Sequence, residues 1–362
     1  MLKSLLDNRI YREDVDRVAE SDLDWDRLQD AVIIISGVSG MIGTFLVDVL
    51  MTRNRLYGLN CTIHGLARDR TTLVARFHEY AGDEHLRLLC VDLAASPMET
   101  PLTDLIDNGT RCFVIHAASN THPVAYASDP IGTILTNVQG THTMLDLAVR
   151  AGARRALFVS TSDIYGENTA GTSRFRESDL GYIDCNTMRA GYPESKRTGE
   201  ALCQAFREHD GLDVVITRLP RVFGPTMKLT DTKAVSQFLL KAATDEDIVL
   251  KSDGNQFYSY CYVADAVSAV LTCLLRGRPG EAYNVADVSC DVSLKDLAQI
   301  VAGTVEKNVV FDTPDEIESR GFSAVTAAPM DGSKLKQLGW HPLYSLSEGV
   351  EHTVAVLKET ID

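Results

Sequence analysis

The sequence of 362 residues has no long hydrophobic run, since no stretch approaches the roughly 20 consecutive apolar residues that span a bilayer. Its amino terminus, MLKSLLDNRIYREDVDRVAE, is charged throughout and lacks an apolar signal core followed by a small-residue cleavage site. These two absences predict a cytoplasmic protein with no membrane partner.

Basic residues are the minority among the charged ones: 35 Lys and Arg stand against 50 Asp and Glu, which gives a net charge of -15. Proteins that bind nucleic acid through its phosphates normally present a basic face, and this chain contains no basic run. We therefore expect no nucleic-acid partner. A local pocket can still be positive, so a small anionic ligand is not excluded.

Patterns typical of metal sites and disulfide frameworks are missing as well. The eight cysteines include no CxxC pair, and no His cluster lies near them at zinc-ligand spacing. Several cysteines fall in apolar, strand-like runs. This usage predicts reduced core thiols in a reducing compartment, and no metal site.

What the chain does contain is an alternation of short β-branched runs with apolar helical segments, beginning at AVIIIS (residues 31–36). Such alternation predicts an α/β fold of the Rossmann type, a doubly wound parallel sheet with a smaller carboxyl-terminal lobe that binds substrate. Strands are expected at 31–36, 61–67, 87–91, 111–116, 156–160, 214–218 and 282–285, and helices at 134–151, 194–208, 265–276 and 293–304.

Three regions follow from this pattern. Residues 1–30 read as a helical extension that packs against the body, and residues 31–220 as the dinucleotide-binding domain. Residues 221–362 read mainly as the substrate-binding lobe, with some segments returning to the first domain. In that lobe FGPTMKLTDTK and KSDGNQFYSYCYV look like loops around a site.

A glycine-rich turn, GVSGMIG (residues 37–43), lies directly between the first strand and the first helix. Its glycines permit a tight turn and a close approach of backbone to a pyrophosphate, and the helix amino terminus beyond it offers free N–H groups. The alternative is a tight turn without ligand. The agreement of strand, spacing and helix favours a dinucleotide site.

The end of the second strand bears on the choice of cofactor. An acidic side chain there would bind the ribose hydroxyls of NAD, whereas Arg68 could pair with the 2′-phosphate of NADP. Asp69 could serve NAD if the register shifts by one residue, and both could simply be solvated loop charges. Asp92 is expected at the adenine edge, and HAAS (residues 116–119) beside the nicotinamide half.

Two segments after the fifth strand carry candidate catalytic groups, STSDIYG (160–166) and YPESK (192–196). Tyr192 and Lys196 are four residues apart on a predicted helix and so share one face. A lysine ammonium and the positive nicotinamide both favour tyrosinate, so we expect a lowered pKa for Tyr192. Such a tyrosine can take a hydroxyl proton while hydride leaves the same carbon for the cofactor. The Thr161 hydroxyl can hold the reacting oxygen.

Together with HAAS, TNVQGTHTMLDLA, FGP and YCYVADAVSA, these motifs resemble the extended short-chain dehydrogenases of the NAD-dependent epimerase/dehydratase family. The resemblance runs over roughly residues 31–350, and UDP-glucuronate decarboxylases and dTDP-glucose 4,6-dehydratases look most similar. It implies NAD as cofactor, although Arg68 leans to NADP, a nucleotide-diphosphate sugar as substrate, and a homodimer formed through two helices of each subunit.

The resemblance also implies roles for individual residues. Thr161, Tyr192 and Lys196 match the catalytic positions, and Asp163 stands where decarboxylases and dehydratases carry a glutamate that acts after C4 oxidation. Asn137 matches a structural asparagine. The residues expected to bind the dinucleotide are Gly37, Ser39, Gly40, Met41, Ile42, Gly43, Arg68, Asp92, Leu93, Ala117, Ala118, Ser119, Asn137, Ser160, Tyr192, Lys196, Pro220 and Val222. Those expected to bind the substrate are Ser119, Ser162, Arg221, Lys233 and Tyr258.

The chain departs from the family pattern at three of these positions. Asp163 keeps the carboxylate but is one methylene shorter than glutamate. Tyr258 stands where family members commonly carry an arginine, and Arg221 where they often carry an asparagine. We hypothesise that Arg221, helped by Lys233, recognises the substrate anion. The alternative is that Arg221 points away and that the pocket takes a different substrate.

The leading hypothesis is an enzyme that oxidises a sugar hydroxyl, at C4, and then epimerises, dehydrates or decarboxylates the sugar. Asp163 favours the last two outcomes over plain epimerisation, while the missing arginine at Tyr258 argues against an ordinary uronate decarboxylase. An NADPH-dependent carbonyl reductase is a second possibility, supported by Arg68. A non-catalytic dinucleotide-binding sensor is a third, and the intact Tyr192–Lys196 pair argues against it.

Overall fold

The computed structural model describes residues 4–95, 110–121, 128–312 and 327–361. Its centre is a seven-stranded sheet in the order β10-β6-β5-β4-β1-β2-β3, in which every neighbouring pair is parallel. This arrangement confirms the doubly wound α/β fold. The strands are β1 (Val32–Ser36), β2 (Thr62–Ala67), β3 (Leu86–Cys90), β4 (Cys112–His116), β5 (Arg155–Thr161), β6 (Val214–Leu219) and β10 (Ala282–Asn284).

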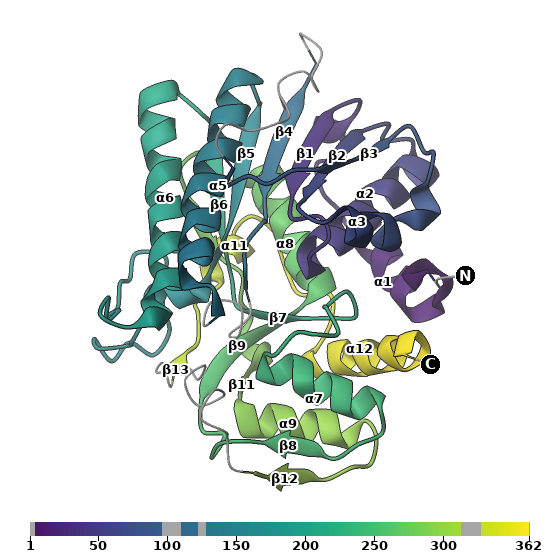
Figure 1. Ribbon diagram of the computed structural model, residues 1–362, viewed down its shortest axis with the longest axis vertical. Helices are drawn as coiled ribbons and strands as arrows, with labels where there is room; N and C mark the ends of the chain where they lie inside the picture. Colours follow the sequence, from purple (N-terminus) through teal and green to yellow (C-terminus); the bar gives the residue numbers. More distant parts are fainter. Residues whose placement is uncertain (1–3, 96–109, 122–127, 313–326, 362) are drawn as a thin grey trace.

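Helices cover both faces of the sheet (Figure 1). Because successive side chains of a strand point to opposite faces, Ile33 and Ile35 of β1 pack in one core and Ile34 in the other. The first core includes side chains of α1 (Arg9–Ala19), α2 (Met41–Tyr57), α8 (Val263–Arg276) and α12 (Leu346–Ile361). The second includes side chains of α5 (Pro130–Arg150) and α6 (Gly191–Asp210).

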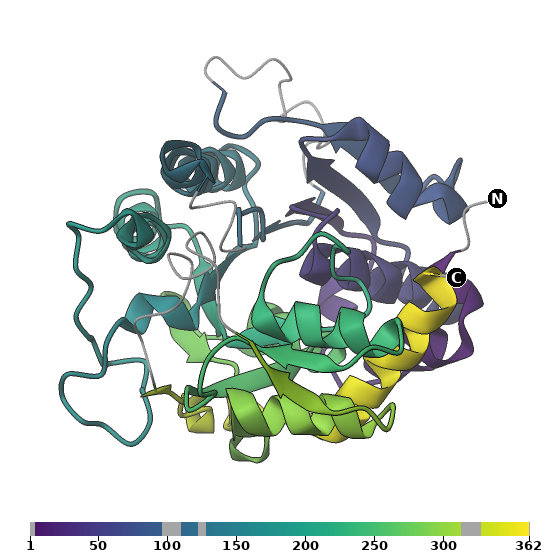
Figure 2. The ribbon, with the colours of Figure 1, turned by 60° about the horizontal axis from the view of Figure 1, so that its bottom comes forward.

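A smaller lobe lies beyond the carboxyl ends of the central strands (Figures 1 and 2). A four-stranded sheet is built around β9, which pairs with β7, β11 and β13, and β8 pairs with β12. The elements of this lobe and its surroundings are β7 (Arg221–Phe223), β8 (Ile248–Leu250), β9 (Phe257–Tyr262), β11 (Asp291–Ser293), β12 (Val309–Phe311), β13 (Ala327–Ala328), α7 (Ala234–Ala243), α9 (Leu294–Gly303) and α11 (Ser333–Lys336). Helix α3 (Arg70–Arg76) follows β2 and lies beside the central sheet, outside the smaller lobe (Figure 1).

The prediction of two loops after residue 220 was partly wrong. Segment 257–262 is strand β9, with five of its six residues buried, and Phe223 belongs to β7. The polar residues and the glycine that precede it, such as Ser252 and Gly254, are typical of a loop. The strand forms because it pairs with segments distant in the chain, and those partners are not visible in a local pattern.

Helix α1 of the amino-terminal segment packs against α2 and α8, and it carries a buried carboxyl group. Asp14 of α1 is fully buried, accepts a hydrogen bond of 2.5 Å from the Tyr262 hydroxyl and lies 2.9 Å from Nδ1 of His352 in α12. A buried carboxylate is stable only when such partners compensate the loss of water. The extension therefore links the first core to both β9 and the last helix.

No helix within the described residues is long and apolar enough to cross a membrane. The eight cysteines are free, and six of them are buried.

Candidate active site

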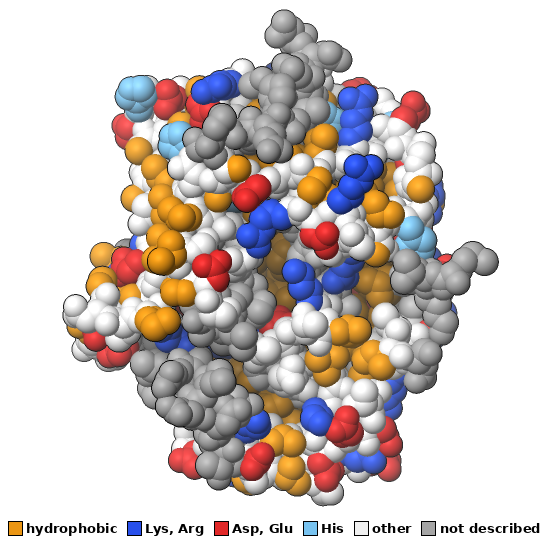
Figure 3. Space-filling model, viewed as in Figure 1, with side chains coloured by type: hydrophobic (Ala, Val, Ile, Leu, Met, Phe, Trp, Pro, Cys, Tyr) orange, Lys and Arg blue, Asp and Glu red, His pale blue; other side chains and the backbone are white. Residues whose placement is uncertain are grey.

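A cavity of about 1220 Å³ lies between the carboxyl ends of the central strands and the smaller lobe. Lys and Arg side chains gather around the hollow in the middle of this face (Figure 3). Eight Lys and Arg residues but only five Asp residues line the cavity, although the whole chain carries a net charge of -15. The local excess of positive charge suits an anionic ligand. All the residues predicted to form the site line this cavity except Asn137.

The glycine turn is shaped by close contacts of backbone with backbone. Gly37 has φ +77°, and a Cβ there would lie 2.7 Å from the backbone nitrogen of Ala118. A Cβ on Gly43 would lie 2.4 Å from the carbonyl oxygen of Gly37. Gly40 is the N-cap of α2 and offers no side chain to its N–H groups. These N–H groups therefore remain available to an anion such as a pyrophosphate.

Beyond the turn, Arg68 and Asp69 follow β2, and Asp92 and Leu93 follow β3. Asp92 accepts a 3.0 Å hydrogen bond from the backbone N–H of Ala94, which leaves its second oxygen for other donors. Leu93 is buried. These side chains border the end of the cavity where the adenosine half of a dinucleotide would lie.

Asn137 lies behind the cavity wall and organises it from the α5 side. Its amide oxygen accepts a 2.7 Å hydrogen bond from the Ser119 hydroxyl, and its amide nitrogen donates one of 2.8 Å to Ser195 Oγ. Ser195 Oγ in turn donates to the carbonyl oxygen of Tyr192 at 2.8 Å. This chain of hydrogen bonds fixes Ser119 and the first turn of α6.

Lys196 is the most deeply placed charge of the site, with a relative exposure of 3%. Its Nζ donates a 2.9 Å hydrogen bond to the carbonyl oxygen of Val159. Burial lowers the pKa of Lys196 to about 8, and the nearby Glu200 carboxylate opposes that shift. Burial also lowers the pKa of His116 to about 3, so this neighbour adds no second positive charge at neutral pH.

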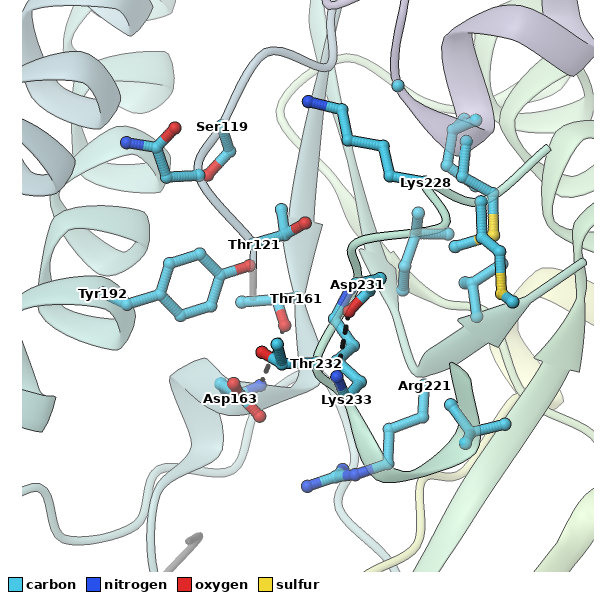
Figure 4. A pocket seen from close by; sticks show the side chains of 18 of the residues that line it. Ser119, Thr121, Thr161, Asp163, Tyr192, Arg221, Lys228, Asp231, Thr232 and Lys233 are labelled. Atoms are coloured by element: carbon cyan, nitrogen blue, oxygen red, sulfur yellow. Dashed lines mark hydrogen bonds and ion pairs between the residues drawn. The ribbon is translucent and has the colours of Figure 1, made fainter. Parts of the chain in front are cut away.

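Tyr192 points from α6 across the cavity toward Thr161, which ends β5 (Figure 4). The Thr161 hydroxyl accepts a 3.2 Å hydrogen bond from the backbone N–H of Asp163 and caps the short helix Ser162–Tyr165. Asp163 thereby stands at the floor of the same cavity. The arrangement brings a phenol, a hydroxyl and a carboxylate around one space, with an ammonium behind them.

The substrate side of the cavity is formed by the smaller lobe. The guanidinium of Arg221 lies 3.3 Å from the centroid of the Tyr258 ring, so the two side chains form a cation–π pair. Lys233 Nζ lies 3.2 Å from Asp231 Oδ2, so part of its charge is already compensated. Tyr260, the cross-strand neighbour of Arg221, has a buried hydroxyl with no hydrogen-bond partner among the described residues.

A buried ion pair, not predicted from the sequence, supports these groups. Arg218 of β6 donates from Nη2 to Glu200 Oε2 at 2.7 Å and from Nε to Oε1 at 3.0 Å. Glu200 Oε1 also accepts a 2.6 Å hydrogen bond from Ser160, whose hydroxyl is thus already engaged. The spacing of Glu200, four residues after Lys196, indicates only that these two side chains share a face of α6, and it gives no sign of Arg218 on β6. Lys228 also lines the cavity; it was not among the predicted site residues, although it lies in one of the segments expected to form a loop around a site.

Comparisons with known proteins agree with this architecture. The model of the NAD dependent epimerase/dehydratase family matches residues 33–286. UDP-glucuronic acid decarboxylase 3 from Arabidopsis thaliana is 30% identical over 327 residues, which cover 88% of this chain and 86% of that protein. UDP-glucuronic acid decarboxylase 1 from Xenopus tropicalis is 28% identical over 333 residues, with 91% and 73% covered.

A solved dTDP-glucose 4,6-dehydratase from Streptomyces venezuelae, with NAD bound, has a TM-score of 0.75 at 23% identity and covers 91% of this chain and 97% of its own. A UDP-glucuronic acid 4-epimerase from Bacillus cereus, also with NAD, has a TM-score of 0.76 at 19% identity, with 91% and 99% covered. At these identities the solved structures show only that the fold is shared. Membership of the family is shown by the family model and by the decarboxylase that is 30% identical. The chain belongs to the NAD dependent epimerase/dehydratase family.

Proposed function

We propose that this protein oxidises a hydroxyl, at C4, of a nucleotide-diphosphate sugar and then converts the resulting ketone into an altered sugar. The observation that carries the proposal is that Tyr192 and Thr161 face the same cavity as the glycine turn, with buried Lys196 behind them. The proposal is supported by the relatives, which are named for reactions of nucleotide sugars, and by the family, which is described as NAD dependent.

The residues fit a nicotinamide dinucleotide, because Gly37 and Gly43 leave no room for a Cβ and α2 presents uncapped N–H groups to the cavity. When bound, the cofactor supplies a reversible hydride acceptor. Tyr192 Oη takes the proton of the sugar hydroxyl, and Thr161 holds the same oxygen by a hydrogen bond. Lys196 favours the anionic form of Tyr192 through its positive charge.

The second step is assigned to Asp163. Once C4 is a ketone, the protons on the adjacent carbon become more acidic, and a carboxylate at the cavity floor can remove or return one. This role supports dehydration, or decarboxylation when C5 bears a carboxylate, over plain epimerisation. The shorter aspartate requires the sugar to lie closer to β5 than a glutamate would.

We assign recognition of the substrate anion to Arg221, with Lys233 as a partly neutralised helper, and substrate binding mainly to residues 221–362. Arg221 supplies five N–H donors, which suit a diphosphate or a carboxylate. Its stacking on Tyr258 supports a fixed orientation of that planar group.

The test is to identify by mass spectrometry the dinucleotide that co-purifies with the protein, and to follow UDP-, dTDP-, CDP- and GDP-sugars by NMR. A new sugar signal without net consumption of cofactor would support the internal redox cycle, and Tyr192→Phe should abolish it. Stoichiometric consumption of NADPH would instead indicate the carbonyl reductase. Absence of any hydride transfer in a single-turnover assay would indicate the sensor.

We further propose a homodimer in a reducing, cytoplasmic compartment. Helices α5 and α6 pack side by side on one flank (Figures 1 and 2), and α5 exposes Ile131, Ile134 and Leu135. Apolar side chains that gather on one helix favour burial against a partner. Sedimentation equilibrium of the protein and of Leu135→Glu tests this, since the substitution should shift the molecules toward monomer.

A further inference from the structure

Glu200 of α6 is the carboxylate that lies one helical turn beyond Lys196. Side chains four residues apart share a face of a helix, with Cβ atoms about 5–6 Å apart. Lys196 is almost completely buried, and its Nζ donates a 2.9 Å hydrogen bond to the carbonyl oxygen of Val159. Burial lowers the pKa of Lys196 to about 8, and Glu200 is the charge that opposes this effect most strongly. The charge of Lys196 near neutral pH therefore depends on this neighbour.

Glu200 is also anchored to the strand that supplies the hydrogen-bond acceptor of Lys196. Its Oε1 accepts a 2.6 Å hydrogen bond from the hydroxyl of Ser160 in β5. Ser160 lies between Val159, whose carbonyl oxygen accepts the ammonium, and Thr161, which lines the cavity. One carboxylate therefore joins the helix that carries the ammonium to the strand end that holds it.

The same carboxylate is shared with a second buried cation, Arg218 of β6. Arg218 donates from Nε to Oε1 of Glu200 at 3.0 Å and from Nη2 to Oε2 at 2.7 Å, which is the bidentate geometry of a strong ion pair. Its Nη1 donates to the hydroxyl of Tyr165 at 2.9 Å and to the carbonyl oxygen of Glu177 at 2.8 Å. Two cations, Lys196 and Arg218, thus lie beside one carboxylate in a largely buried region.

Three further ionisable side chains near this group are neutral around pH 7. Burial lowers the pKa of His116 in β4 to about 3. Burial raises the pKa of the Cys203 thiol in α6 far above neutrality, and it raises the pKa of Tyr165 to about 12. None of the three therefore contributes charge at neutral pH.

Two charged side chains of the same region have other partners. Arg197 of α6 forms an ion pair of 3.2 Å with Glu194. Glu177 Oε1 accepts a 2.8 Å hydrogen bond from the backbone N–H of Asn284. Among the described side chains, the charge balance around the buried ammonium is therefore set chiefly by one carboxylate and one guanidinium.

We propose that Glu200 is a positioning residue that keeps Lys196 charged and aligned for the oxidation step, and that Arg218 limits the strength of this interaction. The inference rests on the proposed function in that Lys196 assists Tyr192. Neither Glu200 nor Arg218 lines the cavity, so both act through Lys196 and the end of β5.

The two charges have opposite effects on Lys196. Glu200→Gln removes the carboxylate and leaves the ammonium near an unpaired guanidinium, so the ammonium should lose its proton at lower pH. Arg218→Met leaves the carboxylate to Lys196 alone, so the ammonium should persist to higher pH. A purely structural role of the ion pair would not give changes of opposite sign.

NMR of protein labelled with ¹³C at the lysine ε carbon follows this titration without any turnover, and Lys196→Met assigns the signal. The titration midpoint should fall by about one pH unit or more in Glu200→Gln and rise by a comparable amount in Arg218→Met. Glu208→Gln is the matched control, because Glu208 is an exposed carboxylate about 12 Å further along α6. Its midpoint should stay within about 0.3 pH unit of the unmodified protein.

The double variant Glu200→Gln/Arg218→Met covers the case in which a single variant does not fold. Breaking a buried ion pair costs more stability than replacing both partners. Because Glu200 is the charge that most favours the ammonium, the double variant should titrate below the unmodified protein and above Glu200→Gln. In the pH–rate profile of oxidation, Glu200→Gln should move the acid limb to higher pH and leave KM within about 2-fold.

The outcomes separate this inference from the proposed function. An unchanged midpoint in Glu200→Gln or in the double variant, or a change of the same sign in both single variants, would overturn the positioning role, whereas oxidation of a nucleotide sugar by the unmodified protein would still uphold the proposed function. The expected midpoints in a protein that oxidises no nucleotide sugar would support the effect of Glu200 on Lys196 and contradict the proposed function.

Discussion

Arg221 and Tyr258 lie on neighbouring strands, β7 and β9, and the guanidinium of the first is stacked on the ring of the second at 3.3 Å from its centroid. Two of the three positions expected to depart from the family pattern thus form one structural unit. The ring of Tyr258 supports the guanidinium of Arg221. The cation of this pair lines the cavity and comes from β7, whereas the tyrosine comes from β9.

If this unit binds the substrate anion, Arg221→Ala should raise the substrate KM or Kd by about 10-fold or more, with a smaller effect on kcat. Tyr258→Phe keeps the aromatic face and should change affinity by less than about 3-fold. Unchanged substrate affinity of Arg221→Ala, measured by calorimetry and by KM, would mean that Arg221 points away from the bound ligand.

Asp163 should act after the first oxidation. Asp163→Asn removes the base but keeps the size of the side chain, so reduction of the bound cofactor in a single turnover should persist. Release of the altered sugar should slow by ~100-fold or more, the usual contribution of a general base. The measurement pairs the absorbance of reduced nicotinamide with NMR of the product.

A control for that experiment is Asp163→Glu, which restores the length that the family residue would have. It should retain product formation. Equal slowing of both half-reactions in Asp163→Asn would instead assign Asp163 to the structure of the Thr161–Asp163 turn.

Lys196 should determine the pH dependence of the oxidation step. Its pKa is lowered to about 8 by burial, so its charge is present below that pH and is lost as the pH rises through it. Without this charge, anionic Tyr192 is less favoured at neutral pH. Lys196→Met should therefore move the acid limb of the pH–rate profile upward by about one unit or more. A profile that keeps its position while only its height falls would contradict this role.

The glycine turn should tolerate no side chain at Gly43. A Cβ there would lie 2.4 Å from the Gly37 carbonyl oxygen and 2.5 Å from Val38 Cα, both backbone atoms that cannot move aside cheaply. Gly43→Ala should destabilise the protein by ~1–3 kcal/mol and weaken dinucleotide binding. Gly303→Ala is the control, because a Cβ at Gly303 meets no atom within 4 Å. Denaturant unfolding and nucleotide titration measure the two effects.

The contact between His352 and Asp14 should make stability depend on pH. The hydrogen bond to Asp14 raises the pKa of His352 above its ordinary 6.5, against the effect of burial. A raised pKa means that the stabilisation is complete below about pH 6.5 and is lost as the pH rises through the folded value. His352→Gln should therefore lower the Tm most at about pH 6 and least at about pH 8.5. An equal loss of Tm at both pH values would indicate lost packing alone.

Local sequence features determined much of this protein. Three short-range patterns predict the architecture: the β-branched run before GVSGMIG, the spacing of Tyr192 and Lys196 on one helix, and the alternation of strands and helices. Together they predict a parallel sheet with its site at the carboxyl ends of the strands, as the structure has it. The positions of Arg68 and Asp163 after strand ends could also be predicted, whereas strand β7, which begins at Arg221, could not. What these residues contact could not.

Only the tertiary structure decided the partners. It joined Arg221 to Tyr258, turned Asp69 toward α3, brought Lys228 to the end of β2 and placed Asn137 behind Tyr192 instead of in the cavity wall. It also made residues 257–262 a strand, because β7, β11 and β13 offered hydrogen-bond partners. The physical reason is common to all of these: each depends on contacts between segments far apart in the chain, and a local pattern of residues contains no information on which distant groups compensate a buried charge or an unpaired strand edge.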